Sequence, residues 1–284
     1  MKILHILNMR RYDDLQFSFD RVSPKADYEL HTHDYHELAI IISGSAVNST
    51  NGFSFDIEPG DVFLVEKGAA HEIRDVDSLK LYNIGFDHNT IRRIGPDLLQ
   101  MPGFQALFQM NQSRDPDRYR LHLNDEELIK VKTLLDEMYA EYEAHSPGFQ
   151  TLLISDFSKL LVLLSRRYSQ AVDDKSSLCI ARALAKMEQD YAGTISIAEL
   201  AASVNLSERH FRRLFEDICH ESPATYLMNL RIKEAERLLI MTTQSITEIA
   251  STCGFYDCNY FSRLFRQRFG QSPSAYRKNR AIRR

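Results

Sequence analysis

The chain has 284 residues, of which 44% are hydrophobic and 26% charged, so it has enough material for two domains that each bury a core. Its formal net charge of -4 argues, over the whole chain, against nucleic-acid binding. The charge is unevenly divided, however, because residues 1–178 hold 19 Lys and Arg against 28 Asp and Glu, whereas residues 179–284 hold 16 against 11. The second part is therefore basic, as expected of a phosphate-binding surface. The first part is acidic, so we expect a different function for it.

The apolar stretch within residues 1–14 is too short for a signal peptide, and no run elsewhere approaches 18 uninterrupted apolar residues. The four cysteines all lie in the second part, at spacings that fit neither a zinc site nor a disulfide framework. We therefore expect a soluble cytoplasmic protein with reduced thiols and no membrane partner. The cysteines are Cys179, Cys219, Cys253 and Cys258.

Residues 1 to about 95 have the pattern of short β-strands, rich in β-branched and aromatic residues. Asn51-Gly52 and Pro59-Gly60 supply the turn chemistry of an antiparallel sheet. Many short strands with tight turns predict a small β-barrel or jelly roll. Three segments carry the pattern: HELAIIISGSAV (36–47), GFSFDIEPGDVFLVEKGAAHEI (52–73) and LKLYNIGFD (79–87).

A group of polar residues lies within these predicted strands. His31, His33 and Glu37 share parity, so on one continuous strand their side chains would point to the same face, and His71 follows later. His36 has the opposite parity, and we expect it to be packed or on the surface.

From about residue 124 the apolar period changes from two to 3.6, which predicts two helices, 124–146 and 149–168, separated by Pro147-Gly148. Asn124 is a plausible cap. The second helix carries more apolar residues than one barrel face needs: Leu153, Phe157, Leu160, Leu161 and Leu164.

Two interpretations fit this surplus: two helices packed on the barrel, or a homodimer interface over 124–168. Both can hold together, and we favour a dimer because symmetric dimers are the commonest oligomers. Residues 169–177 are polar and are interpreted as a linker.

Residues 195–276 contain an internal repeat of two copies. LSERHFRRLFEDICHESPATY, starting at Leu206, aligns with YDCNYFSRLFRQRFGQSPSAY, starting at Tyr256, at an offset of 50. Just upstream, ISIAELAASV (195–204) pairs with SITEIASTC (245–253) at an offset of 49, so the second copy has one extra residue in its turn. A repeat with so small a slip is unlikely to arise by chance.

Each copy predicts a short helix, a tight turn and a second helix, which is the helix-turn-helix arrangement whose second helix enters the major groove. At about 100° per residue, the aromatic and aliphatic residues of that second helix gather on one side and the arginines on the other. The alternative is two ordinary helical hairpins with solvated arginine faces. The inner set is Phe211, Leu214, Phe215 and Ile218 in the first copy and Phe261, Leu264 and Phe265 in the second.

Residues 223–240, between the copies, have broadly helical apolar spacing, with Pro223 at a permitted first-turn position. As one helix they would span about 27 Å at 1.5 Å per residue. That length approaches one turn of DNA, about 34 Å, so both reading helices could occupy successive major grooves on one face of the duplex.

Residues 179–276 resemble the DNA-binding domain of the AraC/XylS family of bacterial transcription regulators. The resemblance includes Gly254-Phe255, the F-S-R-L-F at 261–265 and the F-G-x-S-P-x-x-Y-R that ends at Arg277. In that family the two recognition helices make the base contacts, and Cys258 departs from the polar residues common at its position. The resemblance implies these DNA-binding residues: Arg209, Arg212, Arg213, Cys258, Asn259, Ser262 and Arg263.

The histidine-containing segment resembles the cupin superfamily. Its first motif is matched by His31, His33, Glu37 and Gly44, and its second by Gly60, Gly68 and His71, with Glu66 in place of the usual proline and Asp75 in place of the terminal asparagine. The resemblance implies that His31, His33, Glu37 and His71 either bind a divalent metal such as Fe, Mn, Ni or Zn, or bind an organic effector without metal. A further alternative is that these polar residues satisfy one another.

We therefore predict an α+β protein with two domains. Residues 1–168 form a cupin-like effector-binding and dimerisation domain with an antiparallel barrel (1–95) and a helical hairpin, and residues 178–284 form an all-α DNA-binding domain with two helix-turn-helix motifs. The predicted function is an effector-controlled transcription regulator, an activator by family habit, that is not an enzyme. Its expected partners are operator DNA, RNA polymerase and a small effector such as a sugar or sugar derivative.

Two alternatives belong to other classes. One is a metal-dependent cupin enzyme or metal sensor that carries a DNA-binding domain. The other is an effector-independent DNA-binding dimer in which the barrel is only a scaffold.

Overall fold

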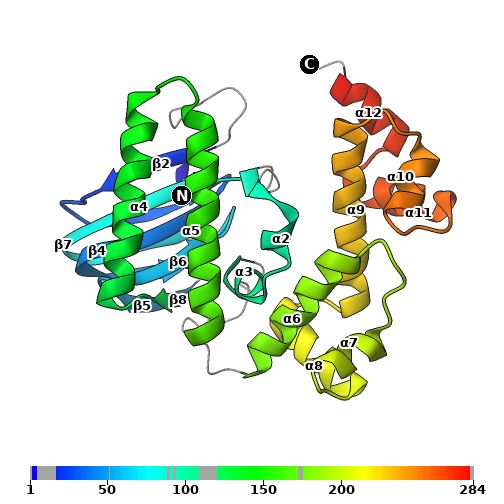
Figure 1. The fold of residues 1–284 in the computed structure, drawn as a ribbon, viewed down its shortest axis with the longest axis horizontal. Helices are drawn as coiled ribbons and strands as arrows, with labels where there is room; N and C mark the ends of the chain where they lie inside the picture. Colours follow the sequence, from blue (N-terminus) through cyan, green and yellow to red (C-terminus); the bar gives the residue numbers. More distant parts are fainter. Residues whose placement is uncertain are drawn as a thin grey trace. The chain divides into compact units, whose positions relative to one another are not determined.

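The computed structural model describes residues 2–4, 17–50, 52–87, 90–91, 94–108, 120–171 and 175–281. The chain divides into two compact units, Met1–Ala181 and Arg182–Arg284, which are treated separately below (Figure 1). In these described segments no helix has both the length and the apolar character that crossing a bilayer requires.

The first unit is built on one curved sheet. Its hydrogen-bonded order is β1-β3-β7-β4-β6-β8, with β2 also paired to β7 and β5 to β4. All pairs are antiparallel except β1 with β3, which is parallel. The strands are β1 (Lys2–Leu4), β2 (Phe17–Val22), β3 (Tyr28–His33), β4 (His36–Thr50), β5 (Phe53–Ile57), β6 (Asp61–Val65), β7 (His71–Phe86) and β8 (Arg120–His122).

Over the described residues the predicted strand region and the Pro59-Gly60 turn are confirmed, whereas Asn51 of the other predicted turn lies outside them. The predicted antiparallel barrel needs two corrections. Over the described residues β1 and β8 are the ends of the order, so the sheet is barrel-like but not closed, and it contains one parallel pair. The curvature comes from the long central strands, because the register between β4 and β7 shifts three times between Ile41 and Val47. Gly44 lies in this stretch at φ 77°, where an added Cβ would lie 2.4 Å from the Ser78 carbonyl oxygen.

Alternate residues of β4 enter two different cores. Ala39 and Ile41 belong to the cluster enclosed by the curved sheet. Leu38 and Ile40, of the opposite parity, are also fully buried and face the other side. On that side Phe17 and Phe86 pack edge-on or tilted against Phe157, with ring centroids 5.2 and 5.3 Å apart.

The helical hairpin consists of α4 (Asp125–Ala144) and α5 (Phe149–Ala171), which lie side by side across the sheet in Figure 1. Asn124 caps α4 as predicted, since its side chain accepts the Glu127 N–H and Glu127 in return accepts the Asn124 N–H.

The five apolar side chains of α5 that suggested a dimer interface are buried within the single chain, so the interpretation that they form an interface is wrong. Leu153, Phe157, Leu160, Leu161 and Leu164 are all at most 1% exposed within the single chain. Part of their cover is a helix that the sequence analysis did not predict, α3 (Pro102–Phe108), which packs so closely that a Cβ on Gly103 would lie 1.8 Å from the Ser165 carbonyl oxygen. The short α2 (Pro96–Leu99) and β8 were not predicted either.

The second unit is all helical. Its helices are the part of α6 (Lys175–Asp190) that follows Ala181, α7 (Ile197–Ser203), α8 (Glu208–Cys219), α9 (Pro223–Met241), α10 (Ile246–Thr252), α11 (Cys258–Phe269) and α12 (Pro273–Ala281). The predicted pair of helix-turn-helix motifs, α7–α8 and α10–α11, and the helical spacer α9 are confirmed. The predicted linker, 169–177, covers the end of α5 and the start of α6, with 172–174 outside the described residues.

Each motif buries its aromatic stripe as predicted. Phe211, Phe215 and Ile218 of α8 are at most 2% exposed, and Phe261 and Phe265 of α11 are fully buried. Leu214 and Leu264, at equivalent positions, are only half-buried. All four cysteines are free thiols, of which Cys253 is buried.

Candidate effector cavity and DNA-reading helices

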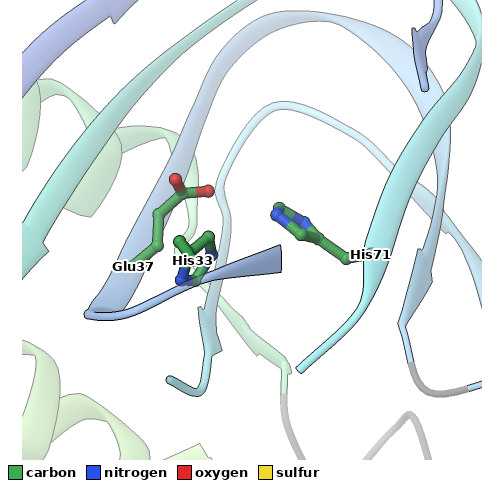
Figure 2. A group of neighbouring side chains, drawn as sticks. All are labelled: His33, Glu37 and His71. Atoms are coloured by element: carbon green, nitrogen blue, oxygen red, sulfur yellow. The ribbon is translucent and has the colours of Figure 1, made fainter. Parts of the chain in front are cut away.

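Three of the four predicted site residues of the first unit meet in space. His33, Glu37 and His71 are buried, and one potential ligand atom from each lies within 4.8 Å of the others. The side chain of His71 extends from β7 toward those of His33 and Glu37 (Figure 2). His33 ends β3 and Glu37 is the second residue of β4, so the single continuous strand that we expected is in fact two strands.

A hydrogen bond of His33 determines which of its ring nitrogens is available to a ligand. Nδ1 of His33 lies 2.7 Å from the Tyr35 carbonyl oxygen, which can only accept, so Nδ1 carries the proton and Nε2 presents its lone pair. Nε2 of His33 and both ring nitrogens of His71 are buried without a hydrogen-bond partner. Buried polar atoms are rarely unpaired, so this cluster is suited to receive a ligand.

Burial sets the protonation of the group. Desolvation lowers the pKa of His33 to about 4 and that of His71 to about 3, so both rings are neutral at pH 7. Desolvation, followed by the charge of Asp20, raises the pKa of Glu37 to about 7. Neutral imidazoles and a carboxyl that exchanges its proton near neutrality are suitable both for hydrogen-bonding an organic molecule and for holding a metal ion.

The fourth predicted residue, His31, lies next to this group but is not a member of it. Its ring packs against that of His71, with centroids 4.2 Å apart, and its Nδ1 donates to the Glu29 carbonyl oxygen at 2.8 Å. His36, on the opposite face of the strand, stacks on Phe86, in agreement with the predicted packing role.

A cavity of about 870 Å³ opens beside the group. Glu37, His31 and His71 line it, so three of the four predicted effector residues have access to it. Its size is in the range that encloses a small organic molecule.

Tyr35 and Asn83 are among the polar residues of this cavity that the sequence analysis missed. The Tyr35 hydroxyl and Asn83 Oδ1 are buried without a partner. Tyr35 shares the parity of His31, His33 and Glu37, which was a usable signal, whereas Asn83 is reached only through the pairing of β7 with β4.

The structure shows what the two glycines of the second cupin-like motif contribute. Gly60 has φ 96°, and a Cβ there would lie 2.4 Å from the Leu123 carbonyl oxygen. Gly68 donates its backbone N–H to the His33 carbonyl oxygen at 2.8 Å, which ties the second motif to the first. Glu66 and Asp75, the two departures from the motif, are not members of the buried group.

In the second unit the structure identifies the extra residue of the second turn. In the first turn the Leu206 N–H donates to the Ala201 carbonyl oxygen, and in the second the Phe255 N–H donates to the Ala250 carbonyl oxygen. The donors and the acceptors of these two bonds are each 49 residues apart, so the offset of 49 holds through the turn. The caps of the next helices, Ser207 and Asp257, are offset by 50. The inserted residue is therefore Tyr256, which is 91% exposed and whose hydroxyl lies 3.0 Å from that of Thr194.

The predicted base-reading residues of α8 differ in availability. Arg209 and Arg213 are exposed, and within the part of the chain that the structure describes neither has an ion-pair partner. Arg212 is half-buried and donates from Nε and one terminal nitrogen to Glu208 at 2.9 and 2.6 Å. Arg212 is therefore the weakest of the three candidates.

The predicted residues of α11 are also graded by exposure. Asn259 and Arg263 are exposed, whereas Ser262 and Cys258 are half-buried. The Cys258 sulfur lies 3.9 Å from the Thr247 hydroxyl, toward α10. The guanidinium of Arg263 lies 5.3 Å from the centre of the Tyr260 ring, a contact that the sequence analysis did not predict.

Comparison with known proteins gives consistent matches to both units. Residues 19–161 match the family model of the AraC-like ligand binding domain, and residues 200–279 match that of a helix-turn-helix domain. The HTH-type transcriptional activator RhaS of Escherichia coli O1:K1 is 29% identical over 285 aligned positions, covering 99% of this chain and 98% of RhaS. The HTH-type transcriptional activator RhaR of Mannheimia succiniciproducens is 28% identical over 254 positions, covering 88% of this chain and 87% of RhaR.

Among solved structures, the DNA-binding domain of AdpA in complex with a target DNA is 32% identical, with a TM-score of 0.35, and covers 37% of this chain and 95% of that chain. The assignment of this chain to a family rests on the family models and on the nearly full-length relatives. It does not rest on this partial structural likeness.

Proposed function

Because this chain belongs to the AraC family of transcription regulators, we propose that it is an activator that binds operator DNA through α8 and α11 and responds to a small molecule bound in the first unit. The observation that carries the proposal is the duplicated helix-turn-helix, whose two second helices bury their aromatic sides and expose Arg209, Arg213 and Arg263. A regulator of transcription acts where the chromosome is, so we propose a cytoplasmic, non-enzymatic protein.

The base contacts follow from side-chain chemistry. Arginine can donate two hydrogen bonds to the O6 and N7 acceptors of guanine, and asparagine can pair with N6 and N7 of adenine. We assign these roles to Arg209 and Arg213 in α8 and to Asn259 and Arg263 in α11. The 19 residues of α9 rise about 28 Å at 1.5 Å each, which supports reading two neighbouring major grooves.

The effector would bind in the cavity of the first unit. The unpaired Tyr35 hydroxyl, Asn83 Oδ1 and His71 nitrogens offer both donors and acceptors, which suits a hydroxyl-rich molecule such as a sugar or sugar derivative. To regulate, the effector must bind one of two states of the protein more tightly than the other. We propose that its binding changes how the protein engages its half-sites and RNA polymerase.

A homodimer through the 124–168 helices remains part of the proposal. Its support is no longer the buried stripe of α5 but three exposed apolar side chains on the same hairpin. Ile129 is 66%, Leu152 51% and Leu163 37% exposed.

The experiment combines a thermal-shift screen of sugars and sugar derivatives with operator binding. A compound that raises the melting temperature should also change operator occupancy. Tyr35→Phe should weaken the compound's effect without unfolding the chain, because the deleted hydroxyl has no partner to lose. The matched control is Arg213→Ala, which should keep the thermal shift and weaken operator binding. If no compound shifts the melting temperature and operator affinity is constant, the chain is an effector-independent DNA-binding protein.

A second candidate, a metal-dependent sensor, is favoured by the buried group itself. Nε2 of His33, a ring nitrogen of His71 and the Glu37 carboxylate are the donor set that Fe, Mn, Ni or Zn accepts, so the residues fit a divalent ion. Such an ion would supply a positive charge and a Lewis-acidic centre at the cavity wall.

Metal analysis of the purified chain tests this candidate. His33→Ala should abolish metal binding, whereas His31→Ala, the matched control outside the group, should retain it. If metal is bound but a reporter gene does not respond to its removal, a metal-dependent cupin enzyme becomes the better explanation. Absence of bound metal after incubation with each ion would leave the organic effector as the ligand of this group.

A further inference from the structure

We propose that Tyr260 is a positioning residue for DNA recognition, holding the guanidinium of Arg263 in place for base contact, and that the first recognition helix has no equivalent. This inference rests on the proposed base-reading role of Arg263. It concerns the ring contact at 5.3 Å, which neither the repeat nor the family motif indicates.

The contact is favoured by the helix geometry. Tyr260 and Arg263 are three residues apart on α11, so their side chains lie on neighbouring parts of the same face. The Tyr260 backbone is fixed, because its N–H donates to Oδ1 of the cap residue Asp257 at 3.3 Å. The ring is 38% exposed and Arg263 is exposed, so the pair lies at the surface and not in the core.

A guanidinium placed over an aromatic ring can turn its face to the ring and keep its edge available. The edge carries the N–H groups that would donate to guanine, so a stacked arginine can still make a bidentate contact. A free arginine side chain must lose its rotamer freedom on binding, which has an entropic cost. The Tyr260 ring restricts that freedom before DNA arrives, and this should favour the correct base specifically.

The first helix lacks this arrangement. Its positions equivalent to Tyr260 and Arg263 are His210 and Arg213. Among the residues that the structure describes, the arginine–aromatic contacts place no ring against Arg213. Base discrimination by Arg213 should therefore be independent of residue 210.

The test uses the full chain, its selected operator and a panel of single base-pair substitutions in that operator, at one salt concentration. Arg263→Ala first identifies the base pair at which discrimination disappears. Tyr260→Leu should then lose roughly two- to five-fold discrimination at that same base pair, as expected for an exposed cation–π contact, and leave the others unchanged. Tyr260→Phe should retain discrimination because the ring face is preserved.

Two variants of the first helix serve as controls. His210→Leu should leave discrimination by Arg213 unchanged, and His210→Tyr, which introduces the missing ring, should increase it at the base pair that Arg213 reads.

The outcomes separate this inference from the proposed function. If Arg263→Ala abolishes discrimination at one base pair and Tyr260→Leu does not weaken it, only the positioning role is overturned. Equal losses from Tyr260→Phe and Tyr260→Leu would assign the effect to the hydroxyl and also overturn it. If Arg263→Ala alters no base preference, the base-reading assignment itself fails, and the role of Tyr260 fails with it.

Discussion

The two helix-turn-helix motifs have the same backbone plan but very different surfaces. Helix α8 carries three arginines and three acidic residues, whereas α11 carries three arginines and no acid. Helix α8 therefore has no net charge from these groups and α11 has three positive charges. The duplicated motifs therefore share a fold while their exposed faces diverge. The first motif is suited to selective contacts, and the second also to sequence-independent attraction to phosphates.

The turns diverge as well. Asn205 and Gly254 occupy equivalent positions with φ 60° and 77°. Asn205 is exposed, and asparagine tolerates this conformation. Gly254 is buried against the segment before α7, where a Cβ would lie 2.6 Å from the Ala192 carbonyl oxygen. The same turn thus requires glycine only in the second motif.

The largest expected effect concerns these turns. Gly254→Ala should destabilise the chain by about 2–4 kcal/mol, from backbone strain together with the clash against Ala192. The matched change Asn205→Ala should cost only about 1 kcal/mol, because it adds no clash. Thermal unfolding of the full chain measures both, and equal losses would show that the two turns have equivalent surroundings.

The next effect concerns base reading. Arg213→Ala should lose roughly 1–3 kcal/mol of affinity at the cognate operator while most binding to random DNA is retained. Arg209→Ala should behave similarly. Titration of labelled cognate and random duplexes gives both affinities, and a parallel loss on the two would reassign these arginines to phosphate contacts.

A smaller effect on DNA affinity is expected from the positive charge of α11. Arg266 is exposed beyond the predicted base-reading positions. Its replacement by alanine should weaken cognate and random DNA alike and reduce the slope of log K against log salt by about 0.9, the value for one lost phosphate contact. Affinities measured over a range of salt concentrations provide the slope, and an unchanged slope would remove Arg266 from the DNA surface.

The smallest effect is expected at Arg212. Its pairing with Glu208 is a half-exposed contact of the i, i+4 type, which contributes about 0.3–0.5 kcal/mol to a helix. Arg212→Ala should change operator affinity by less than about 0.5 kcal/mol. A loss as large as that of Arg213→Ala would mean that Arg212 leaves Glu208 when DNA binds.

Much of the second unit was predictable because its signals are local. The aromatic spacing predicted which sides of α8 and α11 are buried. The identity of the inserted Tyr256 was not predictable, since only the paired backbone hydrogen bonds of the two turns locate it. The Tyr260 contact was missed because it depends on where two side chains lie in space, which the sequence pattern does not give.

The first unit was predicted less completely because its contacts are non-local. Chain parity placed His33 and Glu37 together, but no glycine or proline marks the strand break between His33 and His36. The apolar surplus of α5 suggested an interface only because its cover, α3, has no clear helical signal in the sequence.

The spacer helix α9 has a consequence for the genes that this protein can control. It begins after the cap residue Ser222 and ends before Thr242, whose backbone is extended, so its length is defined at both ends. Each base pair inserted between the two sites shifts the second by about 3.4 Å and rotates it by about 35° around the duplex. A single insertion should therefore abolish simultaneous recognition, and all promoters under this protein's control should share one internal spacing.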